Sequence, residues 1–222
     1  MPETKRAEEV DRDVLSSSVE RSDAELWTLD RSVFVVSSSF EDPDERAFWM
    51  SRPMSERWRA IELMRRMLME KLKLADDFKE FLRLLARHGV KYLLIGGYAV
   101  GVYGYVRPTG DLGVWIAVEA ENADRLVVAL KEFGFGLSNL KPELFLDPKG
   151  IVRMGVPPLR LKILAHISGV DFETCYQDRV AGKVDGVAVD LISLEHLKHN
   201  KAASGRFKDL DDLEHLGGSS TG

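Results

Sequence analysis

The chain has 222 residues, of which 45% are hydrophobic and 30% are charged, and its formal net charge is −5 at pH 7. This balance is typical of an ordinary globular protein and excludes a fibrous or wholly disordered one. The length allows one full domain with a small addition, and the net negative charge argues against indiscriminate binding to nucleic-acid backbones.

Membrane, secretory and zinc-binding classes have little support in the sequence. The apolar runs are shorter than the about 20 residues that a membrane-spanning helix needs, and the opening residues lack the apolar core of a secretory signal. Cys175 is the single cysteine, so an internal disulfide is impossible, and the five histidines are not paired with cysteines. We therefore expect a cytoplasmic protein without a membrane partner.

The N-terminal third divides into two parts. Residues 1–24 are polar and charged, so we expect them to be disordered. Residues 25–74 are expected to form a small segment with a strand over 32–36, a short helix near 45–50 and a longer helix after Pro53. The apolar positions of that longer helix are Trp58, Ile61, Met64, Met67 and Leu68. They recur at three- and four-residue steps, which predicts packing on the main domain or on a partner; a nucleic-acid-binding face of arginines is the alternative.

Residues 75–216 alternate between helical and strand patterns. A helix over 76–88, capped by Asp76 or Asp77 and ended by Gly89, precedes a buried strand over 90–95. The remaining expected elements are helices at 98–103, 122–133, 172–179, 194–203 and 208–216, strands at 112–118, 151–154 and 159–167, and an Asp185-Gly186 hairpin. The order predicts an α/β (α+β) fold with a mixed sheet flanked by helices and a small helical N-terminal extension. We expect residues 217–222 to be a flexible tail.

Gly96-Gly97 stands where the strand over 90–95 ends and the next short helix begins. Two glycines at such a position let the backbone approach phosphate oxygens and direct N–H groups towards them. A tight strand-to-helix turn needs glycine for conformational reasons alone, so the pair by itself is weak evidence for a phosphate site.

The run from Leu93 to Ile116 places an apolar strand, Gly-Gly, a short helix, an arginine and a threonine before a strand that begins with Asp111. This order resembles the signature of the minimal nucleotidyltransferases of the polymerase-β superfamily, and more specifically the AbiEii-type proteins of bacterial toxin–antitoxin and phage-defence systems. The similarity continues through residues 157–172 and 199–216, where an R-x-K-D-x-x-D pattern occurs, and so covers nearly the whole of 75–216.

The resemblance implies a nucleoside triphosphate as substrate or ligand, Mg²⁺ as cofactor, and roles for individual residues. Catalytic roles fall on Asp111, Lys201 and Asp209, with Asp111 also as the metal ligand. The nucleotide-binding positions are Gly96, Gly97, Arg107, Thr109, Lys162, Arg206 and Lys208. The alternative for Lys201, Arg206 and Lys208 is a solvated helix end, for Asp209 a cap of the last helix, and for Asp111 a surface or capping carboxylate.

Two positions depart from the family pattern. Carboxylates at i and i+2 of a strand point to the same side and can hold Mg²⁺ together, but Gly113 follows Asp111 where a second acid is expected. Lys162 stands where the family has its third acid, and Asp190 is a conceivable substitute. We therefore expect a weakened metal site and impaired transfer, with Lys162 neutralising phosphate.

Three readings stay open. The chain is an active nucleotidyltransferase that modifies RNA or protein, a pseudoenzyme that binds a nucleotide, or a non-catalytic module that binds a partner. Residues 31–49 and 55–67 look like a small companion protein of such nucleotidyltransferases, here fused in front. That likeness suggests an antitoxin-like partner, and the amphipathic helix after Pro53 suggests a homodimer.

Overall fold

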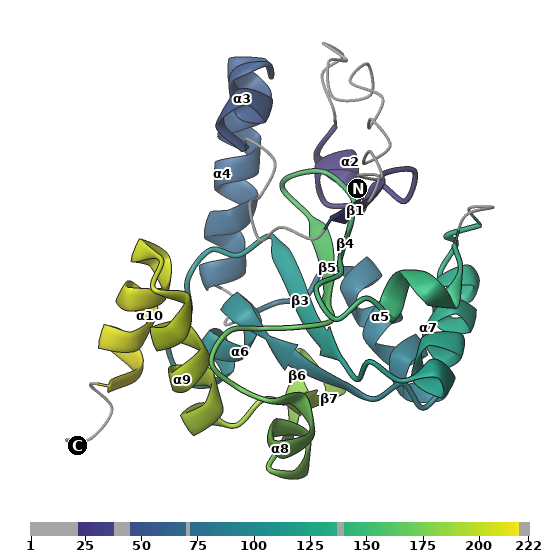
Figure 1. Ribbon diagram of the computed structural model, residues 1–222. Helices are drawn as coiled ribbons and strands as arrows, with labels where there is room; N and C mark the ends of the chain where they lie inside the picture. Colours follow the sequence, from purple (N-terminus) through teal and green to yellow (C-terminus); the bar gives the residue numbers. More distant parts are fainter. Residues whose placement is uncertain (1–21, 38–44, 70–71, 137–139, 218–222) are drawn as a thin grey trace, which may run out of the picture.

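The computed structural model describes residues 22–37, 45–69, 72–136 and 140–217 (Figure 1). The helices are α2 (Asp23–Leu26), α3 (Glu45–Met50), α4 (Met54–Met69), α5 (Asp76–Arg87), α6 (Gly96–Val102), α7 (Ala120–Glu132), η1 (Pro142–Phe145), α8 (Phe172–Gln177), α9 (Leu194–Ser204) and α10 (Phe207–Gly217). The strands are β1 (Phe34–Ser37), β2 (Tyr92–Ile95), β3 (Asp111–Ile116), β4 (Ile151–Met154), β5 (Arg160–Leu164), β6 (Val180–Val184) and β7 (Val187–Leu191).

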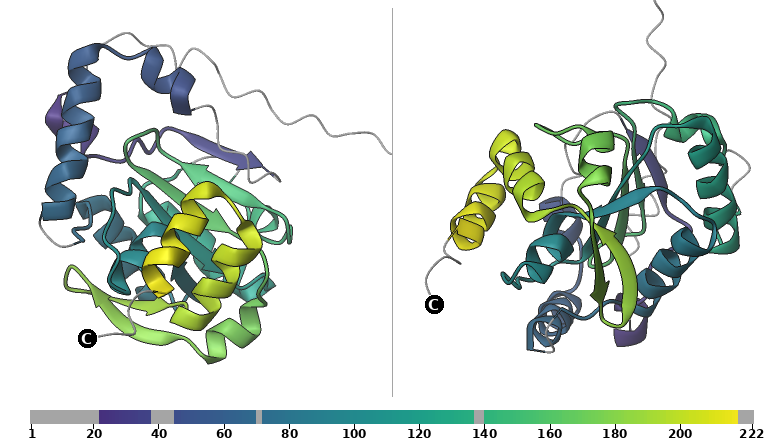
Figure 2. Two further views of the ribbon diagram at one scale, coloured as in Figure 1. Left: turned by 90° about the vertical axis from the view of Figure 1, so that its left-hand side faces the viewer. Right: turned by 90° about the horizontal axis from the view of Figure 1, so that it is seen from below.

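These strands form one 7-stranded sheet in the order β1-β4-β5-β3-β2-β7-β6. The pairs β3–β5 and β2–β7 are parallel, and the other neighbours are antiparallel. Figure 2 shows α5 and α7 on one side of the sheet and α6, α9 and α10 on the other. The expected α/β class, with a mixed sheet flanked by helices, is confirmed.

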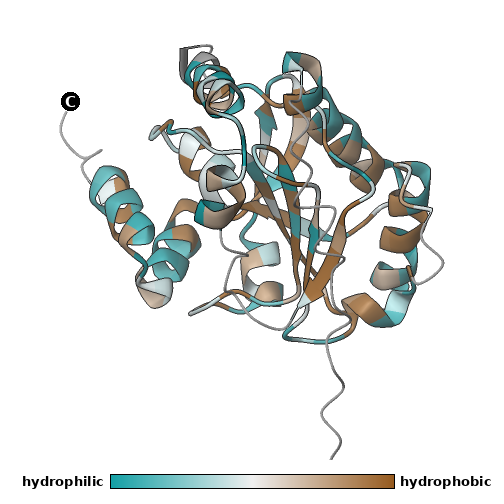
Figure 3. Cartoon of the chain, turned by 90° about the horizontal axis from the view of Figure 1, so that it is seen from above, coloured by the Kyte–Doolittle hydropathy of each residue, from teal (hydrophilic) through white to brown (hydrophobic). Residues whose placement is uncertain are grey.

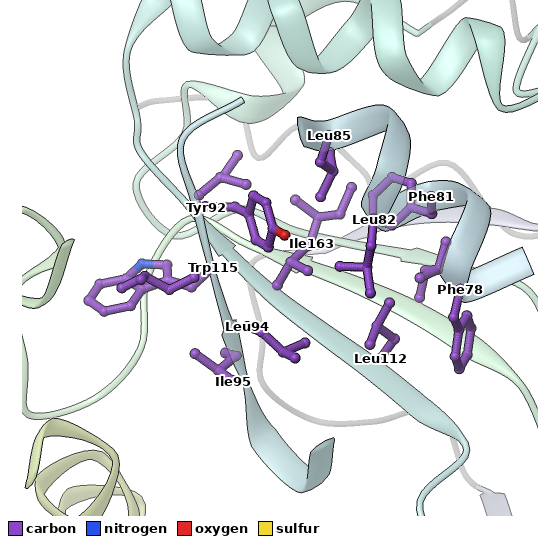
Figure 4. Packing of buried hydrophobic residues seen from close by; sticks show 14 of the residues in the cluster. Phe78, Phe81, Leu82, Leu85, Tyr92, Leu94, Ile95, Leu112, Trp115 and Ile163 are labelled. Carbon is purple, nitrogen blue, oxygen red and sulfur yellow. The ribbon is translucent and has the colours of Figure 1, made fainter. Parts of the chain in front are cut away.

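The main core lies between α5 and the sheet. Phe78, Phe81, Leu82 and Leu85 of α5 are fully buried, because their three- and four-residue spacing places them on one face of the helix. Figure 4 shows them facing Leu112 of β3, while Trp115 of the same strand lies on the opposite side of the sheet. In Figure 3 the strands are largely brown and the outer helices largely teal, as an apolar sheet within polar helices requires.

The N-terminal segment contributes a strand to this same sheet. β1 pairs with β4 in antiparallel register, from Phe34 opposite Met154 to Ser37 opposite Ile151. Leu26 and Leu29 are buried beside it. Residues 34–37 of the N-terminal segment are therefore part of the main sheet.

Several expected boundaries require correction. Residues 22–24 are not disordered, because Ser22 and Glu25 form a capping box that starts α2; residues 1–21 lie outside the described part. Neither Asp76 nor Asp77 caps α5: the N-cap is Ala75, and Asp77 instead accepts from the backbone of Leu29. Gly217 belongs to α10, and the rest of the expected tail lies outside the described residues.

The expectation that the apolar stripe of α4 packs on the main domain is wrong for its central residues. Trp58 is 64% exposed and Ile61 is 58% exposed, whereas Glu56 and Ala60 on another face are buried. Figure 1 shows the reason: most of α4 stands away from the sheet. Packing on a partner stays untested, and the side chains of Met67 and Leu68 lie outside the description. In the described ranges, no helix has the length and apolar character needed to cross a membrane.

Candidate functional site

The floor of the site is one face of three neighbouring strands. Asp111 and Gly113 point to the same side of β3 because they are two residues apart. The parallel register sets Asp111 beside Arg160 and Gly113 beside Lys162 on β5, and the antiparallel register sets Lys162 beside Arg153 on β4. Residues that are far apart in sequence thus bring three cations and one carboxylate to one patch of the sheet.

The opposite wall is formed by the turn between α9 and α10. Asn200 anchors α9, since its Nδ2 donates to the carbonyl of Ser168 at 2.9 Å. Gly205 has a φ of +62°, a left-handed conformation that ends α9 and lets α10 fold back. The turn thereby carries Lys201 and Lys208 towards the strand face, and both line the space between.

That space is a cavity of about 1010 Å³. Six cations and three carboxylates line it: Arg107, Arg153, Lys162, Lys201, Arg206 and Lys208, with Glu45, Asp111 and Asp209. Its apolar side chains are Ile95, Ile151, Leu164 and Ile167. The volume is at the upper end of those of small-molecule sites, and the excess of cations suits an anionic ligand.

The two glycines at the start of α6 are required by geometry. Gly96 has a φ of +71°, a conformation that side chains disfavour. A Cβ on Gly97 would lie 2.6 Å from Thr109 Oγ1 and 3.3 Å from Arg107 Nη1. Gly97 therefore allows Thr109 and Arg107 to approach the backbone at the cavity wall.

Asp111 is already neutralised by cations of the chain. Arg160 donates from Nε to Oδ1 at 2.8 Å and from Nη2 to Oδ2 at 2.9 Å, and Lys162 Nζ lies 2.9 Å from Oδ2. Burial alone would raise the pKa of Asp111, but the positive charges of Lys162 and Arg160 outweigh it and lower that pKa. Arg160 also binds the carboxylate of Glu45, at the first position of α3.

The carboxylates of the R-x-K-D-x-x-D pattern are buried counterions. Asp212 accepts from Arg107 Nε at 2.6 Å and Nη2 at 3.0 Å, and lies 2.8 Å from Lys201. Asp209 binds both Lys201 and Arg206 at 2.6 Å. Burial would raise the pKa values of Asp209 and Asp212, but hydrogen bonds from these cations lower them. Since Lys201 is 4% exposed, its alternative reading as part of a solvated helix end is wrong.

Two cationic groups keep hydrogen-bonding capacity for a ligand. Arg107 Nη1 is buried and has no hydrogen-bond partner in the described parts of the chain. Lys208 forms no ion pair with a described residue, and desolvation together with the charge of Arg107 lowers its pKa. A protonated Lys208 held beside other cations is stabilised when an anion enters.

The donor set does not fit Mg²⁺. Gly113 supplies no side-chain oxygen, and both carboxylate oxygens of Asp111 are held by cations. Asp190 lies 3.6 Å from Arg179 and does not line the cavity. Nowhere in the described ranges do three or more His, Cys, Asp or Glu side chains gather so as to hold a metal ion. A hard divalent ion needs several free oxygen ligands, and this arrangement offers cations in their place.

The structure brings all ten sequence-predicted site residues to the wall of this one cavity. Their roles in binding or catalysis stay predictions. Sequence reasoning missed Glu45, Arg153 and Asn200, which also line it. The pairing of β4 with β5 places Arg153, and the N-terminal segment carries Glu45; no local sequence signal marks either position.

Comparisons with known proteins give little further help. The sequence matches no protein-family model and no curated protein. Among solved structures it is similar to an antigenic nucleotidyltransferase-like protein from Paracoccidioides brasiliensis, with 21% identity and a TM-score of 0.40, over 64% of this chain and 76% of that one. At that TM-score and identity the likeness assigns neither a fold family nor an activity.

Proposed function

We propose that this cavity binds the polyphosphate of a nucleoside triphosphate through side-chain cations, and that metal-dependent nucleotidyl transfer is impaired. The observation that carries the proposal is the charge of the lining, six cations against three carboxylates. Each carboxylate is paired with at least one arginine or lysine. Asp212, which does not itself line the cavity, also pairs with Arg107 and Lys201, so Arg107 Nη1 and Lys208 are the groups that keep capacity for a ligand.

The chemistry of the cationic groups that line the cavity favours phosphate as the ligand. Lys208 and Arg107 Nη1 are donors without described acceptors, and phosphate oxygens accept charge-assisted hydrogen bonds from both groups. Lys162, which stands where the family has an acid, supplies positive charge of the kind that Mg²⁺ otherwise provides. Ligand binding would then depend on ionic strength but little on divalent ions.

The apolar side chains of the cavity wall provide a surface on which the nucleoside can pack. Ile95, Leu164 and Ile167 line the same cavity as the cations, and such surfaces pack against the faces of bases and sugars. This arrangement supports a ligand with one anionic and one apolar end. A nucleoside triphosphate has that form, whereas inorganic polyphosphate has only the first.

The biological setting rests on the sequence motifs. We propose an AbiEii-like nucleotidyltransferase relative of the toxin–antitoxin or phage-defence type, acting in the cytoplasm as a pseudoenzyme. An active nucleotidyltransferase that modifies RNA or protein is the first alternative, and Asp111 would be essential to it. A partner-binding module that does not bind a nucleotide is the second.

Calorimetric titration of each nucleoside triphosphate, in EDTA and then in Mg²⁺, tests the proposal. Changing Lys208→Gln should weaken binding by about tenfold to a hundredfold, the value of a charged hydrogen bond. Lys131→Gln is the control, since it removes the same charge from α7 on the other side of the sheet. Binding that disappears in EDTA, or equal effects of the two changes, would overturn the proposal. Transfer of label from an α-labelled nucleotide, lost on Asp111→Asn, would establish the active enzyme instead.

A further inference from the structure

Glu45 is the one residue of the described N-terminal segment, 22–37 and 45–69, that lines the cavity. It is the first residue of α3, which is joined to α4 by a short turn. In the left view of Figure 2, α3 and α4 arch over one end of the sheet. A carboxylate on this separate element thus reaches a site otherwise built from residues after 94.

Glu45 contacts Arg160, a buried guanidinium that lies next to the cavity lining because it also binds Asp111. Its carboxylate binds Arg160 Nη2, the same nitrogen that donates to Asp111 Oδ2 at 2.9 Å. Glu45 is also near enough for its charge to act on Lys208, one of the two cationic groups that keep capacity for a ligand. A carboxylate and a phosphate present similar oxygen acceptors to a guanidinium.

Glu45 is not the only partner of Arg160. Arg160 keeps both of its hydrogen bonds to Asp111 when Glu45 is removed, so the buried guanidinium keeps a carboxylate partner, which it shares with Lys162. The side chain of Glu45 is 48% exposed, while that of Arg160 is 6% exposed. Arg160 does not itself line the cavity, whereas Glu45 and Asp111, the two carboxylates that it binds, both do. Removal of Glu45 would open one edge of this guanidinium towards the cavity.

We propose that Glu45 is a tethered competitor: it occupies a phosphate-oxygen position beside Arg160, and an incoming polyphosphate displaces it. The inference rests on the proposed function, because it assumes that the cavity takes phosphate. Displacement of Glu45 releases the start of α3 from the sheet. Occupancy of the cavity is thereby coupled to the position of the N-terminal segment.

The test measures the binding of inorganic triphosphate by calorimetry in EDTA at fixed ionic strength, with the full chain. Glu45→Gln should lower Kd by about tenfold, because it removes one negative charge from the phosphate position. Glu62→Gln on α4 is the matched control: it makes the same change in net charge at a side chain that is 41% exposed and paired with Arg65. Its Kd should equal that of the wild type.

A second measurement follows the segment itself. Hydrogen exchange over residues 45–50 should speed up when triphosphate is added to the wild type, and should already be fast in Glu45→Gln. A wild type that binds while Glu45→Gln binds equally or more weakly overturns the competitor and leaves the proposed function intact. Absence of triphosphate binding in the wild type and both variants overturns the competitor, and the proposed function falls as well if nucleoside triphosphates also fail to bind. Binding by Glu45→Gln alone supports the competitor in its strongest form.

Discussion

Replacing Asp212 with Asn should destabilise the fold far more than the same change at its neighbour Asp211. Asp212 is fully buried, accepts two hydrogen bonds from Arg107 and lies 2.8 Å from Lys201. Lys201 keeps Asp209 as a partner, but Arg107 loses its charged partner, and its side chain is only 10% exposed. The change therefore leaves a buried guanidinium without a counterion.

Breaking a buried ion pair from one side costs about 3–5 kcal/mol. The lower end, about 3 kcal/mol, applies here because the amide oxygen of Asn still accepts one hydrogen bond. For a chain of this size, that loss lowers the midpoint of thermal unfolding by about 6–12 °C. Asp211 has a half-exposed side chain that accepts from the hydroxyl of Tyr105, so Asp211→Asn should cost less than about 1 kcal/mol.

Unfolding by urea and by heat, followed by circular dichroism, measures both changes. The pH dependence gives a further check. Because the pKa of Asp212 is lower in the folded state than in the unfolded state, its contribution is fully present above the unfolded value. It is lost as the pH falls through the folded value, so the gap between wild type and Asp212→Asn should close in acid. Equal losses at positions 211 and 212, or a gap that widens in acid, would refute the reasoning.

Three further predictions follow from the same geometry. The affinity for a nucleoside triphosphate should fall as the pH rises, because Lys208 loses its charge. Since the pKa of Lys208 is lowered, this fall should occur at a lower pH than an ordinary lysine would give. Titrations across alkaline pH would detect the fall, and an unchanged affinity would contradict it. The double change Gly113→Asp and Lys162→Asp should create Mg²⁺ binding that calorimetry detects, since a Cβ at position 113 meets no atom closer than 3.4 Å, with the two effects non-additive. Absence of Mg²⁺ binding in the double variant would contradict this prediction. Trp58→Ser should shift the thermal midpoint by less than about 2 °C because the indole is mostly exposed, and a larger fall would place it in a core.

Local patterns in the sequence predicted most elements of the fold. The stripe of α5 and the Asp185-Gly186 turn depend on neighbours within a few residues, and both are found, with Asp185 at a φ of 45° and Gly186 at 81°. The stripe of α4 has the same periodicity, yet Trp58 is exposed. Periodicity identifies an apolar face of a helix but does not say what covers it.

The features of the candidate site likewise include some that the sequence predicted and some that it did not. The resemblance of the sequence motifs identified ten of the lining residues, between Gly96 and Asp209. It did not show that Arg160 and Lys162 neutralise Asp111, which depends on the parallel register of β3 and β5. Nor did it find Glu45, because the contact with Arg160 joins positions 115 residues apart.

The edge position of β1 has a consequence for how the chain folds. β1 pairs with β4, about 120 residues later, so this pairing closes one of the longest loops in the sheet and pays a large entropy of closure. During synthesis β1 leaves the ribosome long before its partner strand exists. We therefore expect the remaining strands to assemble first and β1 to dock last. When β1 detaches, the backbone of β4 becomes an open edge to which a strand from another chain can add.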